Sequence, residues 1–227
     1  MALFVLGDTH LSLGGSKPMD VFPRLERLCG TAGGQLAQAR KARGYHCPCR
    51  RHQLGHAPYR YPQGFRISAA AARPEAHHEG QSRLLVDHRQ QDERYLKAEG
   101  FDTLHILHNN SYSVEGYAIC GTRGWLFDVG EPHDEKVMNR EIGRLKMSLD
   151  AAEPGLEKLV FLHYPPVYTG TSAPEIVATL KAYGIRTCYY GHLHGNAIRY
   201  AVQGDVDGIR YKLVSADGLR FCPYRIN

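Results

Sequence analysis

The chain lacks a long hydrophobic run. None of its apolar stretches approaches the ~18 residues that a membrane-spanning helix needs, so we predict no membrane contact. We also predict no secretory signal, because Asp8 and His10 stand where a signal peptide carries its apolar stretch. These absences favour a cytoplasmic protein, and the six cysteines are then predicted to be thiols rather than disulfides. They are Cys29, Cys47, Cys49, Cys120, Cys188 and Cys222.

A central segment, residues 24–94, lacks the residues that build strands and cores. It holds two β-branched aliphatic residues, Ile67 and Val86, against 19 in the rest of the chain. It carries 13 Lys and Arg, 12 of them Arg, and 6 Asp and Glu, a net charge of +7, whereas the other 156 residues have a net charge of −2. We therefore expect two ordinary globular pieces flanking an irregular, Arg-rich segment without strands.

Outside this segment the sequence predicts alternating strands and helices. Apolar residues recur at helical spacing over 135–152, which indicates an amphipathic helix. A second helix is predicted over 174–183, because this stretch begins with proline and is followed by Gly184. Such alternation is typical of the α/β class. Short apolar runs predict strands at 3–7, 103–107, 117–120, 159–162, 187–190 and 209–214.

Carboxylate and imidazole side chains follow three of the predicted strands. They are Asp8, His10, His163, His192 and His194. The first two follow the strand at 3–7, the third follows that at 159–162, and the last two follow that at 187–190. Loops at strand ends of an α/β sheet are where ligands bind, and a carboxylate with several imidazoles suits a divalent transition metal. A single histidine after a strand is usually structural, but this ordered set predicts a metal site.

These residues resemble the motifs of the calcineurin-like metallophosphoesterases. The matching motifs are Gly7-Asp8-Thr9-His10, Phe161-Leu162-His163 and Gly191-His192-Leu193-His194. Two further stretches, Leu13-Gly14-Gly15 and Pro165-Pro166-Val167, are similar to one bacterial branch of that family. The resemblance covers residues 1–23 and about 95–227.

The resemblance implies a single domain over 1–227, folded as a four-layer α-β-β-α sandwich in which residues 24–94 are anomalous. It implies two divalent metal ions, Mn, Fe or Zn, at the strand ends. Asp8, His10 and His194 would hold one ion, and His163 and His192 would hold the other. The implied activity is hydrolysis of a phosphoester substrate, as a phosphatase or a phosphodiesterase, with nucleic acid expected only as a substrate.

Two motifs of the family are absent from the chain. One is Gly-Asp, whose carboxylate bridges the two metals. The other is Gly-Asn-His-Asp/Glu, which supplies a metal ligand and a histidine that acts on the leaving group. Both should stand within residues 24–94. No catalytic residue is therefore assigned, and we expect weak or absent activity from the chain as written.

Back-translation indicates that this segment is read out of frame. Codons can be chosen for Glu79–Glu93 such that the same bases, read one position later, begin with Lys-Gly-Asn-His-Asp-Tyr-Trp-Trp. Arg50–His56 gives Gly-Asp-Ile-Ser-Trp-Ala-Met in the same frame. Both missing motifs return in the right order. A base gained near Arg24 and a base lost near Arg94 would mark the two ends of the segment. A frameshift would also explain the composition, because an out-of-frame reading of a GC-rich gene tends to yield Arg, Ala, Gly and Pro.

Other interpretations of the segment stay open. A small zinc module would use a Cys-x-Cys pair and three histidines, with the arginines holding phosphates, although this is an uncommon zinc spacing. Its ligands would be His46, Cys47, Cys49, His52 and His56. A disordered insertion is a further possibility. For the whole chain, the alternatives to an enzyme are a basic nucleic-acid-binding protein and a catalytically dead scaffold that keeps the fold.

The frameshift hypothesis makes a prediction about the gene. Across codons 20–100, we expect the nucleotide sequence read one base later to encode Gly-Asp near codon 50 and Gly-Asn-His-Asp near codon 80. Sequencing this region decides the matter. Codons whose shifted frame encodes neither motif, or contains a stop, would contradict the hypothesis.

Overall fold

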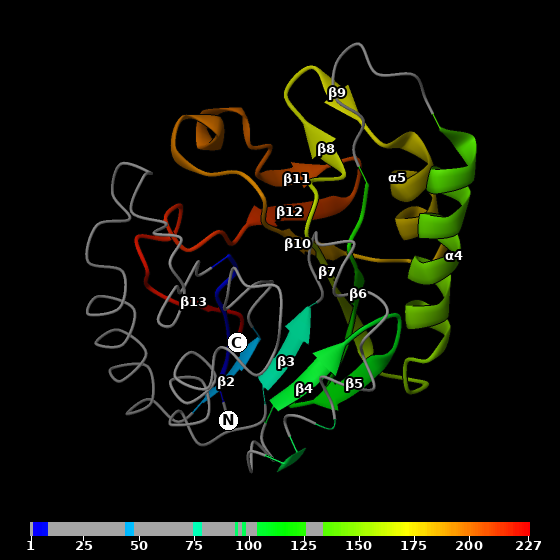
Figure 1. Cartoon of the computed structure of the whole chain (residues 1–227), viewed down its shortest axis with the longest axis vertical. Coiled ribbons are helices and arrows are strands. Elements are labelled where there is room, and N and C mark those ends of the chain that lie inside the picture. Colours follow the sequence, from blue (N-terminus) through cyan, green and yellow to red (C-terminus); the bar gives the residue numbers. More distant parts are fainter. Residues whose placement is uncertain are drawn as a thin grey trace. The chain divides into compact units, whose positions relative to one another are not determined.

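The computed structural model describes residues 2–8, 44–47, 75–78, 94, 97–98, 104–125 and 134–227. They belong to two compact units, one formed by residues 1–106 and 214–227 and the other by residues 107–213. We call these the terminal unit and the helical unit, and each is built on its own sheet (Figure 1). The architecture is mixed α/β, as predicted. That 1–227 form a single domain stays a prediction.

The helical unit contains a six-stranded sheet in the order β11-β12-β10-β7-β6-β5. Its four central strands run parallel, whereas the edge strands β5 and β11 pair antiparallel with their neighbours. Parallel neighbours need crossover connections, and their carboxyl ends meet at the same edge of the sheet. The strands are β5 (Ser111–Val114), β6 (Tyr117–Thr122), β7 (Glu157–Leu162), β10 (Thr187–Tyr190), β11 (Gly204–Val206) and β12 (Ile209–Leu213).

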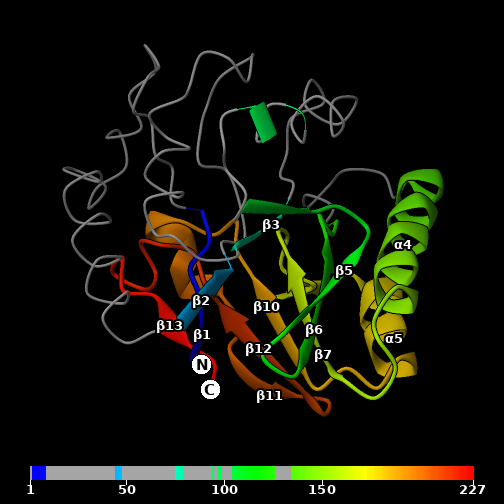
Figure 2. The ribbon, with the colours of Figure 1, turned by 90° about the horizontal axis from the view of Figure 1, so that it is seen from below.

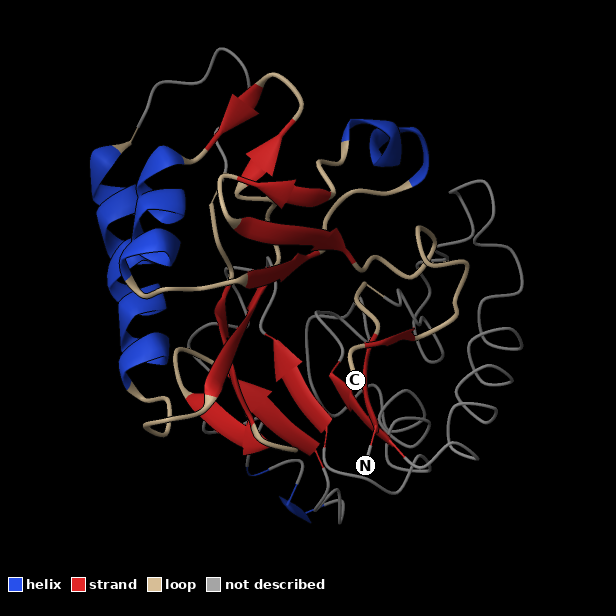
Figure 3. Cartoon of the chain, turned by 180° about the vertical axis from the view of Figure 1, so that it is seen from behind, coloured by secondary structure: helices blue, strands red, loops and turns tan. Residues whose placement is uncertain are grey.

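Two of the three crossovers contain an α-helix, which is α4 (Glu135–Asp150) between β6 and β7 and α5 (Pro174–Ala182) between β7 and β10. The Asp134 side chain caps α4 by accepting hydrogen bonds from the backbone N–H groups of the first turn. Proline starts α5, and Gly184 adopts a left-handed φ of 65° just beyond its end. Figure 2 shows the two helices side by side, and Figure 3 shows them on one side of the six-stranded sheet. Both helices were predicted from the sequence and are confirmed.

The core of the helical unit lies between this sheet and its helices. Val160 and Leu162 of β7 belong to that core, together with Leu145 and Leu149 of α4. The alternate residue Phe161 points to the opposite face and is also fully buried, stacked 4.9 Å from the ring of Tyr189. Burial on both faces explains why the strand reads as a continuous apolar run rather than an alternating one.

The terminal unit contains a five-stranded sheet in the order β13-β1-β2-β3-β4. Strand β1 pairs parallel with β2 and antiparallel with β13, and β2 pairs parallel with β3. The strands are β1 (Ala2–Val5), β2 (Gly44–Cys47), β3 (Glu75–His78), β4 (Leu104–Leu107) and β13 (Tyr224–Arg225).

Strands β2 and β3 correct the prediction that residues 24–94 hold no strands. The ladder of a sheet is made by backbone N–H and C=O groups, which nearly every residue carries, so the neighbouring β1 can pair with a segment of low β-propensity. Most of the remainder of this segment, including Cys49, His52 and His56 of the alternative zinc module, lies outside the described residues.

Several short elements were not predicted, because a two-residue strand or a short 3-10 helix carries too little periodicity. They include the hairpin of β8 (Val167–Tyr168) and β9 (Thr171–Ser172) and the 3-10 helix η3 (Gly195–Tyr200). Among the described residues, no helix is long and apolar enough to cross a membrane. Cys120, Cys188 and Cys222 are free thiols, as predicted for these three.

Gly121 in β6 provides a test of the packing. A Cβ at this position would lie 2.1 Å from the backbone oxygen of Phe161, so we expect Gly121→Ala to lower the free energy of unfolding by about 1–3 kcal/mol. The control Gly143→Ala, in α4 with nothing within 4 Å of the new Cβ, should raise it by about 0.5–1 kcal/mol. Urea unfolding followed by helical circular dichroism measures both. Equal stability of the two variants would contradict the described strand pairing.

Candidate metal centre

Two of the predicted ligands follow neighbouring parallel strands of the helical unit. Strands β7 and β10 pair in register, with Leu162 beside Tyr190 at their carboxyl ends. His163 comes directly after β7 and is fully buried, and His192 comes two residues after β10. The register therefore brings both histidines to one edge of the sheet.

The two imidazole rings are in contact. Nδ1 of His192 lies 3.1 Å from Nε2 of His163, and the rings are perpendicular, with centroids 4.8 Å apart. In the neutral state, one of these nitrogens donates a hydrogen bond and the other accepts it. Two imidazole nitrogens that bind the same cation have a similar separation.

The backbone at His192 is strained. This residue has a φ of 72°, and the N–H of Leu193 donates a 2.9 Å hydrogen bond to Gly191 O across it. Such a three-residue turn with a positive central φ is rare and strained. Strain of this kind costs about 1–3 kcal/mol and persists where the surrounding structure requires it, typically at functional sites.

Asp8 occupies a comparable position in the terminal unit, after β1. Its carboxylate is fully buried and its φ is 47°, in the left-handed region. The preceding Gly7 is fixed by the C-terminal segment, because its N–H donates to Val214 O at 2.7 Å and its carbonyl accepts from Ala216 N–H at 2.8 Å. Ser215 Oγ lies 3.4 Å from Asp8 Oδ2. The sequence therefore places a buried carboxylate at the end of β1.

The other two predicted ligands are less informative. His10 lies outside the described residues. His194 is half-buried, in extended conformation, and precedes the first turn of η3. Within the described ranges, the structure contains no group of three or more His, Cys, Asp and Glu side chains arranged to hold a metal ion. It brings His163 and His192 together, which makes two nitrogen donors of the predicted set.

An aromatic and cationic cluster adjoins the histidine pair. The Tyr164 ring lies 4.9 Å from the His163 ring and 4.5 Å from the His192 ring, centroid to centroid. The guanidinium of Arg123 packs on the rings of Trp125 and Tyr164. None of these three residues was predicted from the sequence. Their only signal is their position within five residues of the ends of the predicted strands at 117–120 and 159–162.

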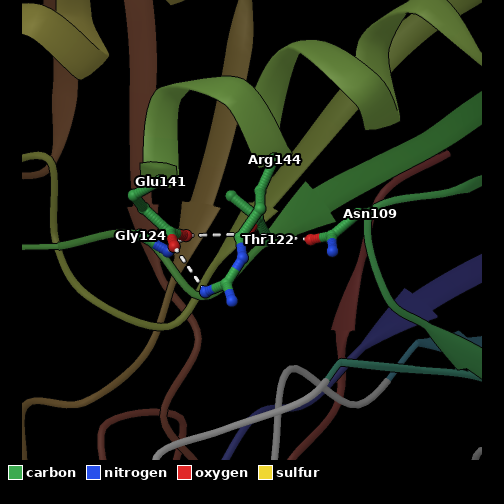
Figure 4. Close-up of polar contacts among 5 residues, drawn as sticks. All are labelled: Asn109, Thr122, Gly124, Glu141 and Arg144. Atoms are coloured by element: carbon green, nitrogen blue, oxygen red, sulfur yellow. Dashed lines mark hydrogen bonds and ion pairs between the residues drawn. The ribbon is translucent and has the colours of Figure 1, made fainter. Parts of the chain in front are cut away.

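Glu141 of α4 holds the loop that carries Arg123. Its Oε1 accepts hydrogen bonds from Thr122 Oγ1 and from the N–H of Gly124, each at 2.7 Å (Figure 4). Its Oε2 lies 3.4 Å from Nη1 of Arg144, in an ion pair within the helix. The carboxylate is therefore anchored on both oxygens, and it bonds the residues on either side of Arg123.

The buried thiols in this unit do not offer a reactive group. Burial raises the pKa of Cys120 and, more strongly, that of Cys188. Both therefore stay protonated at neutral pH and are poor nucleophiles. Burial likewise raises the pKa of Tyr190, whose hydroxyl donates to Val202 O at 2.6 Å.

No protein-family model and no curated protein matches the chain. Among solved structures, TT1561 of Thermus thermophilus is similar, with a TM-score of 0.54 and 16% identity over 85% of this chain and 82% of that one. A second solved structure has a TM-score of 0.63 and 11% identity, over 93% and 90%. A protein of unknown function from Aquifex aeolicus, AQ665, has a TM-score of 0.49 and 13% identity over 99% and 95%. The first two similarities concern the fold alone.

The Glu141 contacts predict a stability effect. Glu141→Ala leaves the N–H of Gly124 and the hydroxyl of Thr122 without this acceptor, so we expect a loss of about 2–4 kcal/mol in the free energy of unfolding. Glu141→Gln keeps an acceptor oxygen and should lose less. The control Arg144→Gln removes only a partly exposed ion pair and should cost below about 1 kcal/mol. Urea unfolding measures the stability of each variant. Equal losses of stability in Arg144→Gln and Glu141→Ala would contradict the role given to the Glu141 hydrogen bonds.

Proposed function

We propose that the chain is a metal-dependent phosphoester hydrolase of the calcineurin-like metallophosphoesterase type. The observation that carries this proposal is the contact between His163 and His192 at the ends of adjacent parallel strands. The chain would act on a phosphoester substrate with two divalent ions, Mn, Fe or Zn. Its motifs resemble those of the family, and the structural similarity to TT1561 supports only the fold.

The histidine pair fits a metal ion. Two nitrogens that each lie about 2.1 Å from one ion are separated by about 3.0 Å at a 90° angle and by about 3.4 Å at the tetrahedral angle. The observed separation of 3.1 Å falls within this interval. The strained turn at His192 supports the proposal further, because strained backbone is frequent at functional sites.

The terminal unit supports the proposal through the order of its parallel strands. Asp8 follows β1, and strand β2 ends at Cys47, close before the position at which the shifted frame encodes Gly-Asp. Strand β3 ends at His78, directly before the stretch that encodes Gly-Asn-His-Asp. Strands β1, β2 and β3 are parallel neighbours, so each lost motif would follow a strand of the same sheet as Asp8.

We also propose the four-layer α-β-β-α sandwich. Two helices cover one face of the six-stranded sheet, and the other face carries Phe161 and Leu159, which are buried as well. A face with buried apolar side chains requires a second covering layer. In a sandwich, the second sheet provides that layer.

When bound, the divalent ions would lower the pKa of a water molecule and stabilise the charge that develops on the phosphoryl group. His163 and His192 would hold an ion through their ring nitrogens, and the Asp8 carboxylate would supply negative charge, as the resemblance implies. The bridging carboxylate and the leaving-group histidine are absent in this reading frame. The chain as written would therefore be a weak or inactive enzyme that keeps part of the site.

The proposal predicts metal binding by the unaltered chain. Elemental analysis after equilibration with Mn²⁺ should find metal, and His163→Ala and His192→Ala should each lower its content at least about tenfold. A suitable control is His105→Ala, because His105 is exposed on β4 and is not part of the predicted set. Metal content that is the same in all three variants, or no metal in the unaltered chain, would argue against the site.

A second prediction concerns activity. Deleting one base near codon 24 and restoring one near codon 94 should return the bridging Asp, the Asn ligand and the leaving-group His. General acid assistance alone is worth ~100- to 10,000-fold. We therefore expect the corrected chain to hydrolyse an aryl phosphate mono- or diester with added Mn²⁺ at least ~100-fold faster than the chain as written. Inactivity of both proteins would remove the enzyme claim and favour a scaffold.

A further inference from the structure

Arg123 is fixed beside the histidine pair through its backbone. Strands β6 and β7 are parallel, with Thr122 in register with Leu162, so Arg123 and His163 are the next residues along two adjacent strands. The carbonyl of Arg123 accepts hydrogen bonds from the N–H groups of His163 and Tyr164, both at 2.9 Å. The main chain of this arginine is thus bonded directly to the loop that carries the candidate ligand.

The guanidinium of Arg123 lies against two aromatic rings. Its Cζ is 4.5 Å from the ring centroid of Trp125 and 5.6 Å from that of Tyr164. Tyr164 in turn contacts both imidazoles. Stacking on rings orients a planar guanidinium and leaves its N–H groups, which point outward in the plane, free to bind an oxyanion.

This cation has no acceptor among the described residues. Its Nε is buried without a hydrogen-bond partner there, and no described carboxylate pairs with it. Three other cations of the same unit have a carboxylate partner, since Arg144, Lys181 and Arg210 each face an Asp or Glu at 3.0–3.4 Å. A half-buried positive charge without a counter-ion is costly, and an arriving anion would offset that cost.

The loop around Arg123 is held by hydrogen bonds on both sides of the arginine. Glu141 accepts hydrogen bonds from the residue before it and the residue after it. Gly124 adopts a φ of 71°, and a Cβ there would lie 3.2 Å from the backbone oxygen of Tyr164, so the close approach favours glycine. A binding group is most effective when its surroundings fix it in advance, because less freedom is lost on binding.

We propose that Arg123 is a substrate-binding residue that holds an anionic oxygen of the phosphoryl group through its terminal nitrogens. The hydrolysis of that group rests on the function proposed above, but phosphate binding by Arg123 does not require it. Trp125 and Tyr164 orient the guanidinium, and Glu141 is a positioning residue that acts through the loop.

The test uses the full unaltered chain and inorganic phosphate. Calorimetric titration at constant ionic strength, with chloride as the reference anion, gives the dissociation constant. Fluorescence locates the binding, because Trp125 is the only tryptophan of the chain. The variants are Arg123→Gln, which removes the charge, and Arg123→Lys, which keeps the charge without the planar fork. The matched control is Arg199→Gln, since Arg199 also stacks on a tyrosine, with Cζ 4.6 Å from the Tyr200 ring centroid.

We expect saturable phosphate binding with a change in Trp125 fluorescence, weakened at least about tenfold by Arg123→Gln and less by Arg123→Lys, and unchanged by Arg199→Gln. Absence of phosphate binding to the unaltered chain, or equal affinity of Arg123→Gln, would overturn the proposal. The two proposals can fail separately. If phosphate binding depends on Arg123, but the chain binds no Mn²⁺ and the frame-corrected chain hydrolyses no phosphoester, this inference stands and the proposed function is contradicted.

Discussion

The parallel register of β6, β7 and β10 is the constraint on which the candidate site depends. Because the three strands end at one edge of the sheet, the residues that follow them are adjacent although they lie far apart in the sequence: Arg123, His163 and His192. The contact between the imidazoles and the hydrogen bonds from the 163–164 backbone to Arg123 are direct consequences. Helices α4 and α5 pack on one face of this sheet.

Much of the helical unit could be predicted from the sequence. The strands β7 and β10 are short apolar runs buried on both faces of the sheet, β12 alternates buried apolar residues with more exposed polar ones, and α4 has a regular apolar stripe ending in Leu149. His163 and His192 were predicted as ligands because each follows such a run. Strand ends are defined by local pattern, and polar residues there are visible without knowledge of the fold.

The remainder depends on contacts that no local pattern encodes. Strands β2 and β3 form through backbone pairing in a segment of poor β-propensity, and the composition of residues 24–94 argued against them. Arg123 and Tyr164 gain their interest only from the rings they contact in three dimensions. Glu141 lies on an otherwise amphipathic helix, where a buried carboxylate is recognised only once its partners in the 122–124 loop are known.

The central claim is that the imidazoles of His163 and His192 share a metal ion. Anomalous diffraction at the manganese edge, from crystals of the unaltered chain grown with Mn²⁺, tests it most directly. We expect a peak about 2.1–2.3 Å from Nε2 of His163 and from Nδ1 of His192. The contradicting result is an absence of anomalous density at the pair, with the two nitrogens hydrogen-bonded to each other at the 3.1 Å separation described above.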